Sequence, residues 1–318
     1  MSKFAREKII KGNQLLMPSG NAICYSGYRD GQSPQTNDYP SYEEILEDLQ
    51  LLSTNWQYLR LYDCSQHALT VLKVIRDNNL AFKVMLGVDL GAEVSNPNCP
   101  WGADYSDDVL QQNRAVNERD INSLITIANE YSDIAFAASI GNEASVEWND
   151  HMVPVERLVA YATLVKNNIA QPVTFCENYV PWLDKLKPLV EVVDFISIHT
   201  YPVWEYQTIE SALSYTEQNY QSVAQAHPNK PIVITEAGWT TNSNGCGIEA
   251  WNASVQLQAE YCAQLHTWSK ETNILTFMFE AFDEPWKGSS DANEPEKHWG
   301  FFDVNRVPKL VMRRIFAS

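Results

Sequence analysis

The ten residues Ile134–Glu143 are IAFAASIGNE, an apolar run that ends in a glycine, an asparagine and a carboxylate. Nearly continuous apolar character over so short a length is typical of a strand in a parallel sheet that helices cover. Seven further runs of this kind, rich in β-branched or aromatic residues, recur along the chain, so we predict eight strands. The seven are Asn21–Arg29, Tyr58–Asp63, Phe82–Leu90, Pro172–Tyr179, Asp194–Trp204, Pro231–Trp239 and Ile274–Trp286.

Amphipathic stretches with helical spacing separate these runs. In Ser41–Ser53, Ser41 precedes Glu44 by three residues, which is the spacing of a capping box, and the leucines that follow share one face. Pro154 and Pro308 suit the first turns of the helices that follow the fourth and eighth strands. Further helices are predicted over His67–Asn79, Asn117–Tyr131, Pro154–Ile169, Ile209–Ala226 and Trp251–Thr272.

Eight successive β-then-α units predict a (β/α)8 TIM barrel. The 318 residues suit one such domain, and no Pro-, Gly- or Ser-rich linker divides them. We therefore predict a single catalytic domain over 1–318, with 1–20 as an N-terminal lead-in. The structural alternative is a doubly wound open sheet. It lacks support because Gly27 and Gly31 do not fit a G-x-G-x-x-G motif after the first strand, and Gly245–Gly247 indicates a turn.

Charge and hydropathy exclude several classes of partner. Forty acidic against 23 basic side chains give a net charge of −17, so a nucleic acid would be repelled. No apolar run is long enough to span a bilayer, and we expect a monomer without membrane partners. The start, Met1–Lys8, lacks the apolar stretch of a secretory signal. A cytoplasmic protein is expected if this chain is complete, and a periplasmic or extracellular one if a leader was removed.

Cysteines and histidines give no sign of a metal or cofactor. The six cysteines form no C-x-x-C pair and accompany no histidine cluster, so we predict buried thiols, no metal and no cofactor. The aromatic content is more informative, with ten tryptophans and fifteen tyrosines. Most should lie in the core, but sugar rings also stack on such faces, because their C–H edges are apolar.

The active site of a barrel lies at the carboxyl ends of its strands. The residues found there are carboxylates, tyrosines and tryptophans with very few cations, whereas a phosphate or carboxylate ligand would require arginine or lysine. This ring therefore predicts a site for a neutral sugar. The candidate binding residues are Tyr25, Tyr28, Tyr62, Asn142, Tyr179, Tyr201, Trp239, Glu280, Phe282, Glu284, Trp286, Lys287 and Glu296.

Two carboxylates are the candidate catalytic pair. Glu143 ends the fourth strand and Glu236 lies near the end of the seventh, so a closed barrel can bring them together across its mouth. Glycoside hydrolysis needs one carboxylic acid to protonate the leaving oxygen and one carboxylate to attack the sugar or activate water. His199, at the end of the sixth strand, could fix a carboxylate, but we expect a core histidine. Tyr25, Tyr28 and Tyr62 fit a packed barrel rim equally well.

Six short segments in order along the chain resemble glycoside hydrolase family 17, the β-1,3-glucanase family. They are Leu59–Asp63 (LRLYD), Val84–Val88 (VMLGV), Gly141–Glu143 (GNE), Thr235–Trp239 (TEAGW), Phe279–Lys287 (FEAFDEPWK) and Glu296–Gly300 (EKHWG). The resemblance runs nearly end to end. It implies hydrolysis of β-1,3-glucan with net retention, without metal or cofactor, with Glu143 as general acid/base and Glu236 as nucleophile.

The same resemblance implies roles for four neighbours. Asn142 is similar to an asparagine that binds the sugar 2-hydroxyl, and Lys287 would help to keep adjacent carboxylates ionised. The polar network beside the nucleophile is matched by Glu284, Lys287 and Glu296. The form of Phe279–Lys287 resembles the fungal and bacterial branch.

The sequence also departs from the family pattern. Thr240 and Thr241 stand where the family often has proline, and Gly288–Pro295 resembles an insertion that would wall off one end of a cleft. Two alternatives stay open. One is a β-1,3-glucanosyltransferase that uses the same intermediate, and the other is a non-catalytic carbohydrate-binding barrel, which the presence of both glutamates disfavours. Endo or exo cleavage, chain-length preference and branching are left open.

Overall fold

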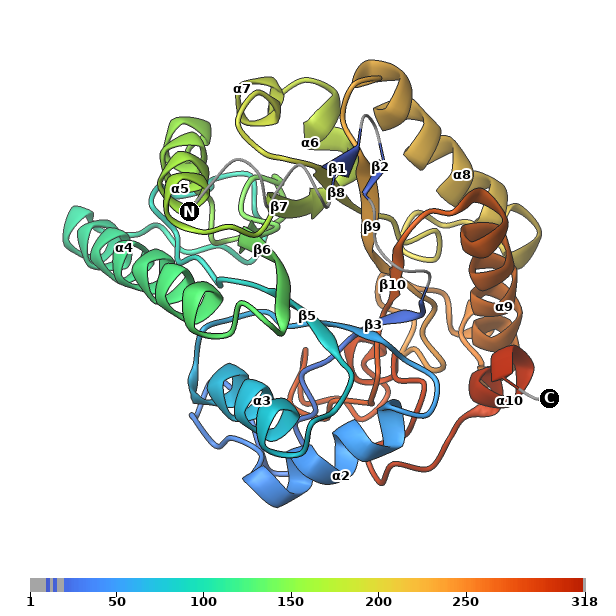
Figure 1. Ribbon diagram of the computed structural model, residues 1–318. Coiled ribbons are helices and arrows are strands. Elements are labelled where there is room, and N and C mark those ends of the chain that lie inside the picture. Colours follow the sequence, from blue (N-terminus) through green and yellow to red (C-terminus); the bar gives the residue numbers. More distant parts are fainter. Residues whose placement is uncertain (1–9, 12–13, 16–19, 317–318) are drawn as a thin grey trace.

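The computed structural model describes residues 10–11, 14–15 and 20–316, and a closed barrel of eight parallel strands forms its centre (Figure 1). Each strand lies within one of the predicted apolar runs and pairs with its neighbours in chain order, so the predicted (β/α)8 barrel is confirmed over the doubly wound alternative. The strands are β3 (Ala22–Cys24), β4 (Tyr58–Arg60), β5 (Lys83–Leu86), β6 (Ala135–Asn142), β7 (Val173–Asn178), β8 (Ile196–His199), β9 (Ile232–Ala237) and β10 (Thr276–Met278).

Helices surround the strands on the outside (Figure 1). They are α2 (Tyr42–Leu52), α3 (Gln66–Asp77), α4 (Asp107–Glu130), α5 (Val155–Asn168), α6 (Tyr179–Leu183), α7 (Lys187–Val190), α8 (Ile209–Ala226), α9 (Val255–Thr272) and α10 (Leu310–Phe316), with 3-10 turns η1 (Ala250–Asn252) and η2 (Pro295–Lys297). In the predicted lead-in, β1 (Ile10–Lys11) pairs antiparallel with β2 (Gln14–Leu15), and much of the rest lies outside the described residues. The assignment of the whole chain to one domain stays a prediction.

The start of α2 shows how local sequence sets an element. The Ser41 hydroxyl accepts a hydrogen bond from the Glu44 amide, and the Glu44 carboxylate accepts one from the Ser41 amide at 2.8 Å. This reciprocal arrangement is the predicted capping box. Ile45, Leu49 and Leu52 then place one fully buried face of α2 against the barrel.

Three helix predictions need correction. Helix α4 begins at Asp107, where Ser106 caps it, well before the predicted Asn117, and the apolar Val109 and Val116 of its first turns are exposed. Pro154 is the N-cap of α5 rather than a residue of its first turn. Pro308 lies outside α10, in an isolated bridge with Phe302. Between β7 and β8, where no helix was predicted, the chain forms the short α6 and α7.

The six cysteines differ in their burial. All six thiols are free, and Cys24, Cys99, Cys176 and Cys262 are buried as expected. Cys246 is exposed and Cys64 is half-buried, so the prediction of buried thiols fails at these two positions. Among the described residues, no helix is both long and apolar enough to cross a membrane.

Candidate active site

A cleft of about 1340 Å³ lies at the carboxyl ends of the barrel strands. Both candidate catalytic glutamates line it, together with most of the predicted binding residues. The predicted residues in its wall are Tyr25, Tyr28, Tyr62, Asn142, Glu143, Tyr179, Tyr201, Glu236, Trp286, Lys287 and Glu296. The segment after β10 contributes Gly288, Ser289 and Glu294, so the predicted insertion does border the cleft.

The strand ends bring Glu143 and Glu236 together. A carboxylate oxygen of each, together with a ring nitrogen of His199, lies within 4.8 Å of the others. Glu143 directly follows β6 with a φ of 45°, and its amide donates to the carbonyl of Cys176 at 2.9 Å. The Glu143 side chain is 23% exposed and that of Glu236 is 6% exposed. The pair is therefore one cleft-facing carboxyl beside one enclosed carboxylate.

Glu236 is held by three donors. The buried guanidinium of Arg60 bonds its Oε1, Tyr62 donates to the same oxygen at 3.0 Å, and Tyr201 donates to Oε2 at 2.6 Å. Burial alone would raise the pKa of Glu236, but the charges of His199 and Arg60 and the bonds from Tyr201 and Arg60 lower it to about 2. Glu236 is therefore an ionised, rigidly held nucleophile candidate.

His199 lies between the two glutamates, and the expectation of a core histidine is wrong in that respect. Its Nδ1 is 2.8 Å from Glu143 Oε1 and 3.4 Å from Glu236 Oε2, and its ring is fully buried. Burial would lower the pKa of His199, but the Glu236 charge and the interactions with Cys176 and Glu143 raise it to about 10. A protonated imidazole thus places a positive charge beside the Glu236 carboxylate.

Glu143, His199 and Glu236 are also the one group in the described part of the chain whose ligand atoms are close enough to hold a metal ion. Arg60 bonds Glu236 directly, so an added cation would face a buried guanidinium. This charge arrangement does not fit a metal site.

In the cleft wall, Lys287 is placed between two buried glutamates, Glu280 and Glu284. Its Nζ lies 2.6 Å from Glu280 and 2.7 Å from Glu284. Burial would raise the pKa of Glu284, but Lys287 and Ser26 lower it, whereas burial raises the pKa of Glu280 well above its usual range despite Lys287. Lys287 therefore favours the ionised form of Glu284, but at Glu280 it does not outweigh the effect of burial on the pKa. Neither glutamate lines the cleft, so their predicted substrate contacts need correction.

Glu296 does line the cleft, and the charges of Glu143 and Glu236 act on it. Burial raises its pKa to about 7, opposed by Lys287 and reinforced by the negative charges of Glu143 and Glu236. Under mildly acidic conditions Glu296 is therefore protonated while Glu236 is ionised.

Two predicted aromatic contacts are core residues instead. Trp239 is fully buried, donates from Nε1 to the Asn252 carbonyl at 2.8 Å and packs on Tyr261 of α9. Phe282 is buried against Tyr25 and Phe302. Proximity to a strand end did not decide the direction of these side chains. Trp239 turns away from the mouth, between β9 and α9.

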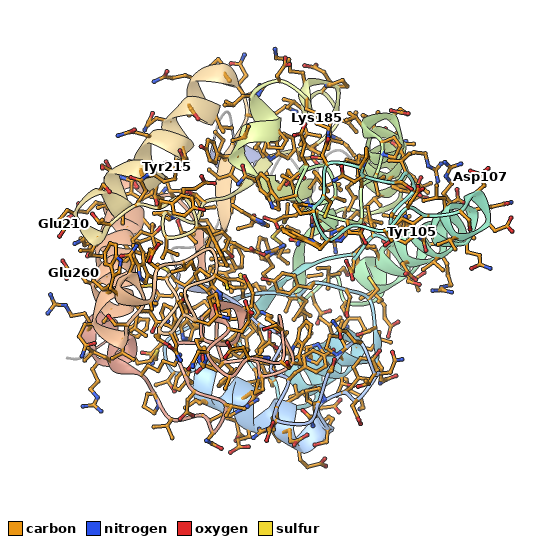
Figure 2. The ribbon with its side chains drawn as sticks, turned by 180° about the vertical axis from the view of Figure 1, so that it is seen from behind. Tyr105, Asp107, Lys185, Glu210, Tyr215 and Glu260 are labelled. Carbon is orange, nitrogen blue, oxygen red and sulfur yellow. The ribbon has the colours of Figure 1, made fainter. Side chains whose placement is uncertain are left out.

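The predicted tyrosines differ in how deeply they are buried in the cleft wall. Tyr25 is fully buried and its hydroxyl donates to Asp48 at 3.1 Å, so it shapes the wall without offering that hydroxyl. Tyr28 stacks on His67 with ring centroids 5.2 Å apart. Tyr179 contacts Tyr215 of α8, which is labelled in Figure 2, with hydroxyls 3.2 Å apart.

The sequence interpretation missed two kinds of site residue. Arg60 is a buried charge at the end of the apolar strand β4, and since a buried charge needs a partner, that position was a usable signal. The loops contribute Trp101, Trp148 and Tyr206, which line the cleft and are 69%, 43% and 76% exposed. Loop aromatics follow no periodicity, so no pattern distinguished them.

A β/α barrel with two close carboxylates in an aromatic cleft is typical of glycoside hydrolases. The sequence model of the BtgE/BtgC glycoside hydrolase domain matches residues 22–300, and the chain belongs to this family. The chain is 27% identical over 296 residues to an Aspergillus flavus protein named "Probable glucan endo-1,3-beta-glucosidase btgC". That match covers 85% of this chain but only 40% of the relative.

Two solved structures are similar in fold. An endo-laminarinase from Formosa is 27% identical with a TM-score of 0.78, covering 92% of this chain and 85% of that one. A glycoside hydrolase family 17 β-1,3-glucanosyltransferase from Rhizomucor miehei is 22% identical with a TM-score of 0.71, covering 92% and 96%. The second similarity shows the shared barrel fold alone.

The two tryptophans predicted to contact the sugar, Trp239 and Trp286, should differ in their effect on stability. Trp239→Ala leaves a cavity between β9 and α9 and should lower the free energy of unfolding by about 3–5 kcal/mol. Trp286→Ala, which removes a half-buried cleft side chain, should lower it by less than half as much. Urea unfolding of both variants measures this difference. Equal losses would contradict the placement of Trp239 in the core and Trp286 in the cleft wall.

Glu236 and Glu296 should give opposite pH dependences of stability. The pKa of Glu236 is lowered from 4.5 to about 2, so its contribution is present above 4.5 and lost as the pH falls toward 2. The pKa of Glu296 is raised from 4.5 to about 7, so its contribution is present below 4.5 and lost as the pH rises toward 7.

Urea unfolding of the wild type, Glu236→Gln and Glu296→Gln over this pH range tests both signs. The stability of the wild type relative to Glu236→Gln should fall on acidification below 4.5, and its stability relative to Glu296→Gln should fall between 4.5 and 7. If the two stability differences changed with pH in the same direction, the electrostatic environments assigned to Glu236 and Glu296 would be wrong.

Proposed function

We propose that this domain hydrolyses β-1,3-glucosidic bonds of laminarin-type glucans with net retention, with Glu143 as general acid/base and Glu236 as nucleophile. The observation that carries this proposal is the approach of their carboxylate oxygens to within 4.8 Å. Retaining enzymes place the two carboxyl groups about 5–5.5 Å apart, whereas inverting enzymes leave about 6.5–9.5 Å for a water molecule. The close pair supports double displacement.

In the first step, Glu236 attacks the anomeric carbon while Glu143 donates its proton to the glycosidic oxygen, which leaves as a hydroxyl. The sugar is then bound covalently to Glu236. In the second step, Glu143 takes a proton from water, the water oxygen attacks the anomeric carbon, and the Glu236 carboxylate is released. The bonds from Arg60, Tyr62 and Tyr201 hold Glu236 ionised and oriented for the attack.

Several features of the cleft support a neutral glucan as substrate. Lys287 is paired with Glu280 and Glu284, so it is not a free cation for a phosphate or uronate. The Oδ1 of Asn142 accepts from Arg60, which leaves the amide nitrogen to donate to a sugar hydroxyl, the role proposed for it here. The names of the Aspergillus relative and of the Formosa endo-laminarinase support the β-1,3 linkage.

Membership of glycoside hydrolase family 17, in its fungal and bacterial branch, is part of the same proposal. It is supported by the six motif segments and by the Rhizomucor barrel that carries this family name. The activity of any longer protein stays a proposal, because the chain spans about 40% of the length of the Aspergillus relative. A monomer without nucleic-acid or membrane partners remains a prediction.

A transferase reaction is the second candidate. Trp101, Trp148 and Tyr206 are exposed aromatic surfaces on the cleft, and such faces favour binding of a sugar acceptor in place of water. The transferase reaction requires these three side chains to bind the acceptor side of a glucan chain.

A time course with end-labelled laminarihexaose tests the substrate and separates the two candidates. We expect labelled laminari-oligosaccharides shorter than the substrate, and their lengths report the cleavage mode. Products longer than the substrate would assign the transferase reaction. An equally labelled β-1,4-linked hexaose is the linkage control and should remain intact. No cleavage of laminarihexaose, or faster cleavage of the control, would refute the proposed function.

Replacing the nucleophile tests the mechanism. Glu236→Gly should lose far more than tenfold in kcat, because no glycosyl-enzyme can form and covalent catalysis supplies several kcal/mol of the barrier. Added azide should restore part of the turnover on an activated aryl glycoside and give the α-glycosyl azide. Activity within about tenfold of the wild type would exclude Glu236 as the nucleophile.

A further inference from the structure

Glu177, at the carboxyl end of β7, is a buried carboxyl that the mechanism above does not use. It is fully buried and does not line the cleft. Its Oε2 accepts from the Ser145 amide at 2.9 Å and from the Ser145 hydroxyl at 2.6 Å, and its Oε1 accepts from the Asn178 amide at 2.7 Å. Burying a carboxyl group costs free energy unless hydrogen bonds offset that cost. The hydrogen bonds of Glu177 therefore show which part of the chain it holds in place.

Two of these three bonds reach the segment that follows the proposed general acid. Ser145 is two residues after Glu143, whose φ of 45° lies in the left-handed region that residues other than glycine rarely adopt. Such a conformation persists where surrounding contacts enforce it. The turn that directs the Glu143 side chain therefore needs external support.

Glu177 binds the amide and the hydroxyl of Ser145, and other groups bind the carbonyl oxygens of this turn. Lys185, labelled in Figure 2, donates to the Ser145 carbonyl at 2.5 Å. Val153 donates to the Ala144 carbonyl at 2.8 Å, and Asn149 donates to the Glu143 carbonyl at 3.0 Å. Of these groups, Glu177 alone binds both the amide and the hydroxyl of Ser145.

We propose that Glu177 is a positioning residue that, through Ser145, fixes the turn that aims Glu143 at the glycosidic oxygen. This inference rests on the proposed function, because it requires Glu143 to be the general acid. The nucleophile is held separately, by Arg60, Tyr62 and Tyr201. Loss of Glu177 should therefore impair proton donation more than nucleophilic attack.

The neutral form of Glu177 supports the choice of a conservative variant. Burial raises its pKa to about 8, and the negative charge of Glu143 adds to the shift. Glutamine has nearly the same shape as an uncharged carboxyl and keeps one oxygen that can accept both bonds from Ser145, whereas its amide nitrogen cannot accept from the Asn178 amide. Glu177→Gln should therefore preserve most of the positioning that Glu177→Ala removes.

A series of aryl β-laminaribiosides with leaving groups from dinitrophenol to phenol separates positioning of the acid from general damage. Dinitrophenol leaves without help from an acid, whereas phenol requires it, and general acid catalysis contributes about 10²–10⁴-fold. For Glu177→Ala, kcat/KM should fall at least about tenfold more on the phenyl than on the dinitrophenyl substrate. Glu143→Gln should show the same bias more strongly, and Glu177→Gln should largely restore the wild-type ratio.

Glu93 offers a matched control, since it is also a fully buried carboxyl. It accepts from Asn117 at 3.0 Å, Tyr161 at 2.5 Å and Arg157 at 2.7 Å, and none of these bonds reaches the turn after Glu143. Glu93→Ala should lower Tm and leave the ratio of phenyl to dinitrophenyl activity unchanged. A purely structural role for Glu177 would give this same result.

Equal losses of Glu177→Ala on the two substrates would overturn the inference. If Glu177→Ala does not fold, Ser145→Ala replaces it, because this change removes one of the two bonds from Ser145 and keeps the amide bond. It should show a smaller bias of the same sign, and an unbiased loss would likewise overturn the inference. Failure of the proposed function itself is a separate result, namely a wild-type protein that does not cleave laminarihexaose.

Discussion

The buried guanidinium of Arg60 is the constraint on which the geometry of this site depends. A charge enclosed by β-strands is strongly destabilising unless partners neutralise it and accept its hydrogen bonds. Arg60 satisfies this requirement with the carboxylate of Glu236 and the amide oxygen of Asn142. Because the planar guanidinium directs its donors at fixed angles, it sets the position of Glu236 on β9 relative to the end of β6, where Glu143 follows directly.

The same enclosed environment gives neighbouring carboxyls different protonation states. Arg60 and His199 keep the pKa of Glu236 at about 2, against the effect of burial. At Glu177 and Glu296 the opposing hydrogen bonds and charges do not overcome desolvation, and the pKa values rise to about 8 and about 7. A retaining mechanism needs its nucleophile ionised, and the charges and hydrogen bonds around Glu236 meet that requirement.

The parts predicted from the sequence are those that leave a local pattern. Each strand was visible as an apolar run, because parallel strands are buried on both faces. Position at a strand end was also enough to find Glu143 and Glu236, but it could not give the side-chain direction that places Trp239 in the core. His199 was expected to be a core histidine, because its partners, Glu143 after β6 and Glu236 on β9, lie far from it in the sequence. Loop residues such as Trp148 follow no periodicity, so only the folded chain shows that they line the cleft.

The stereochemistry of the first product tests the central claim most directly. Proton NMR of a fresh digest of reduced laminari-oligosaccharide, recorded before mutarotation, reports the anomer released by the enzyme. If Glu236 attacks and Glu143 first donates and then removes a proton, two inversions at the anomeric carbon should release the β-anomer. Release of the α-anomer would mean a single displacement by water and would contradict the pairing of these two carboxyls as nucleophile and acid/base.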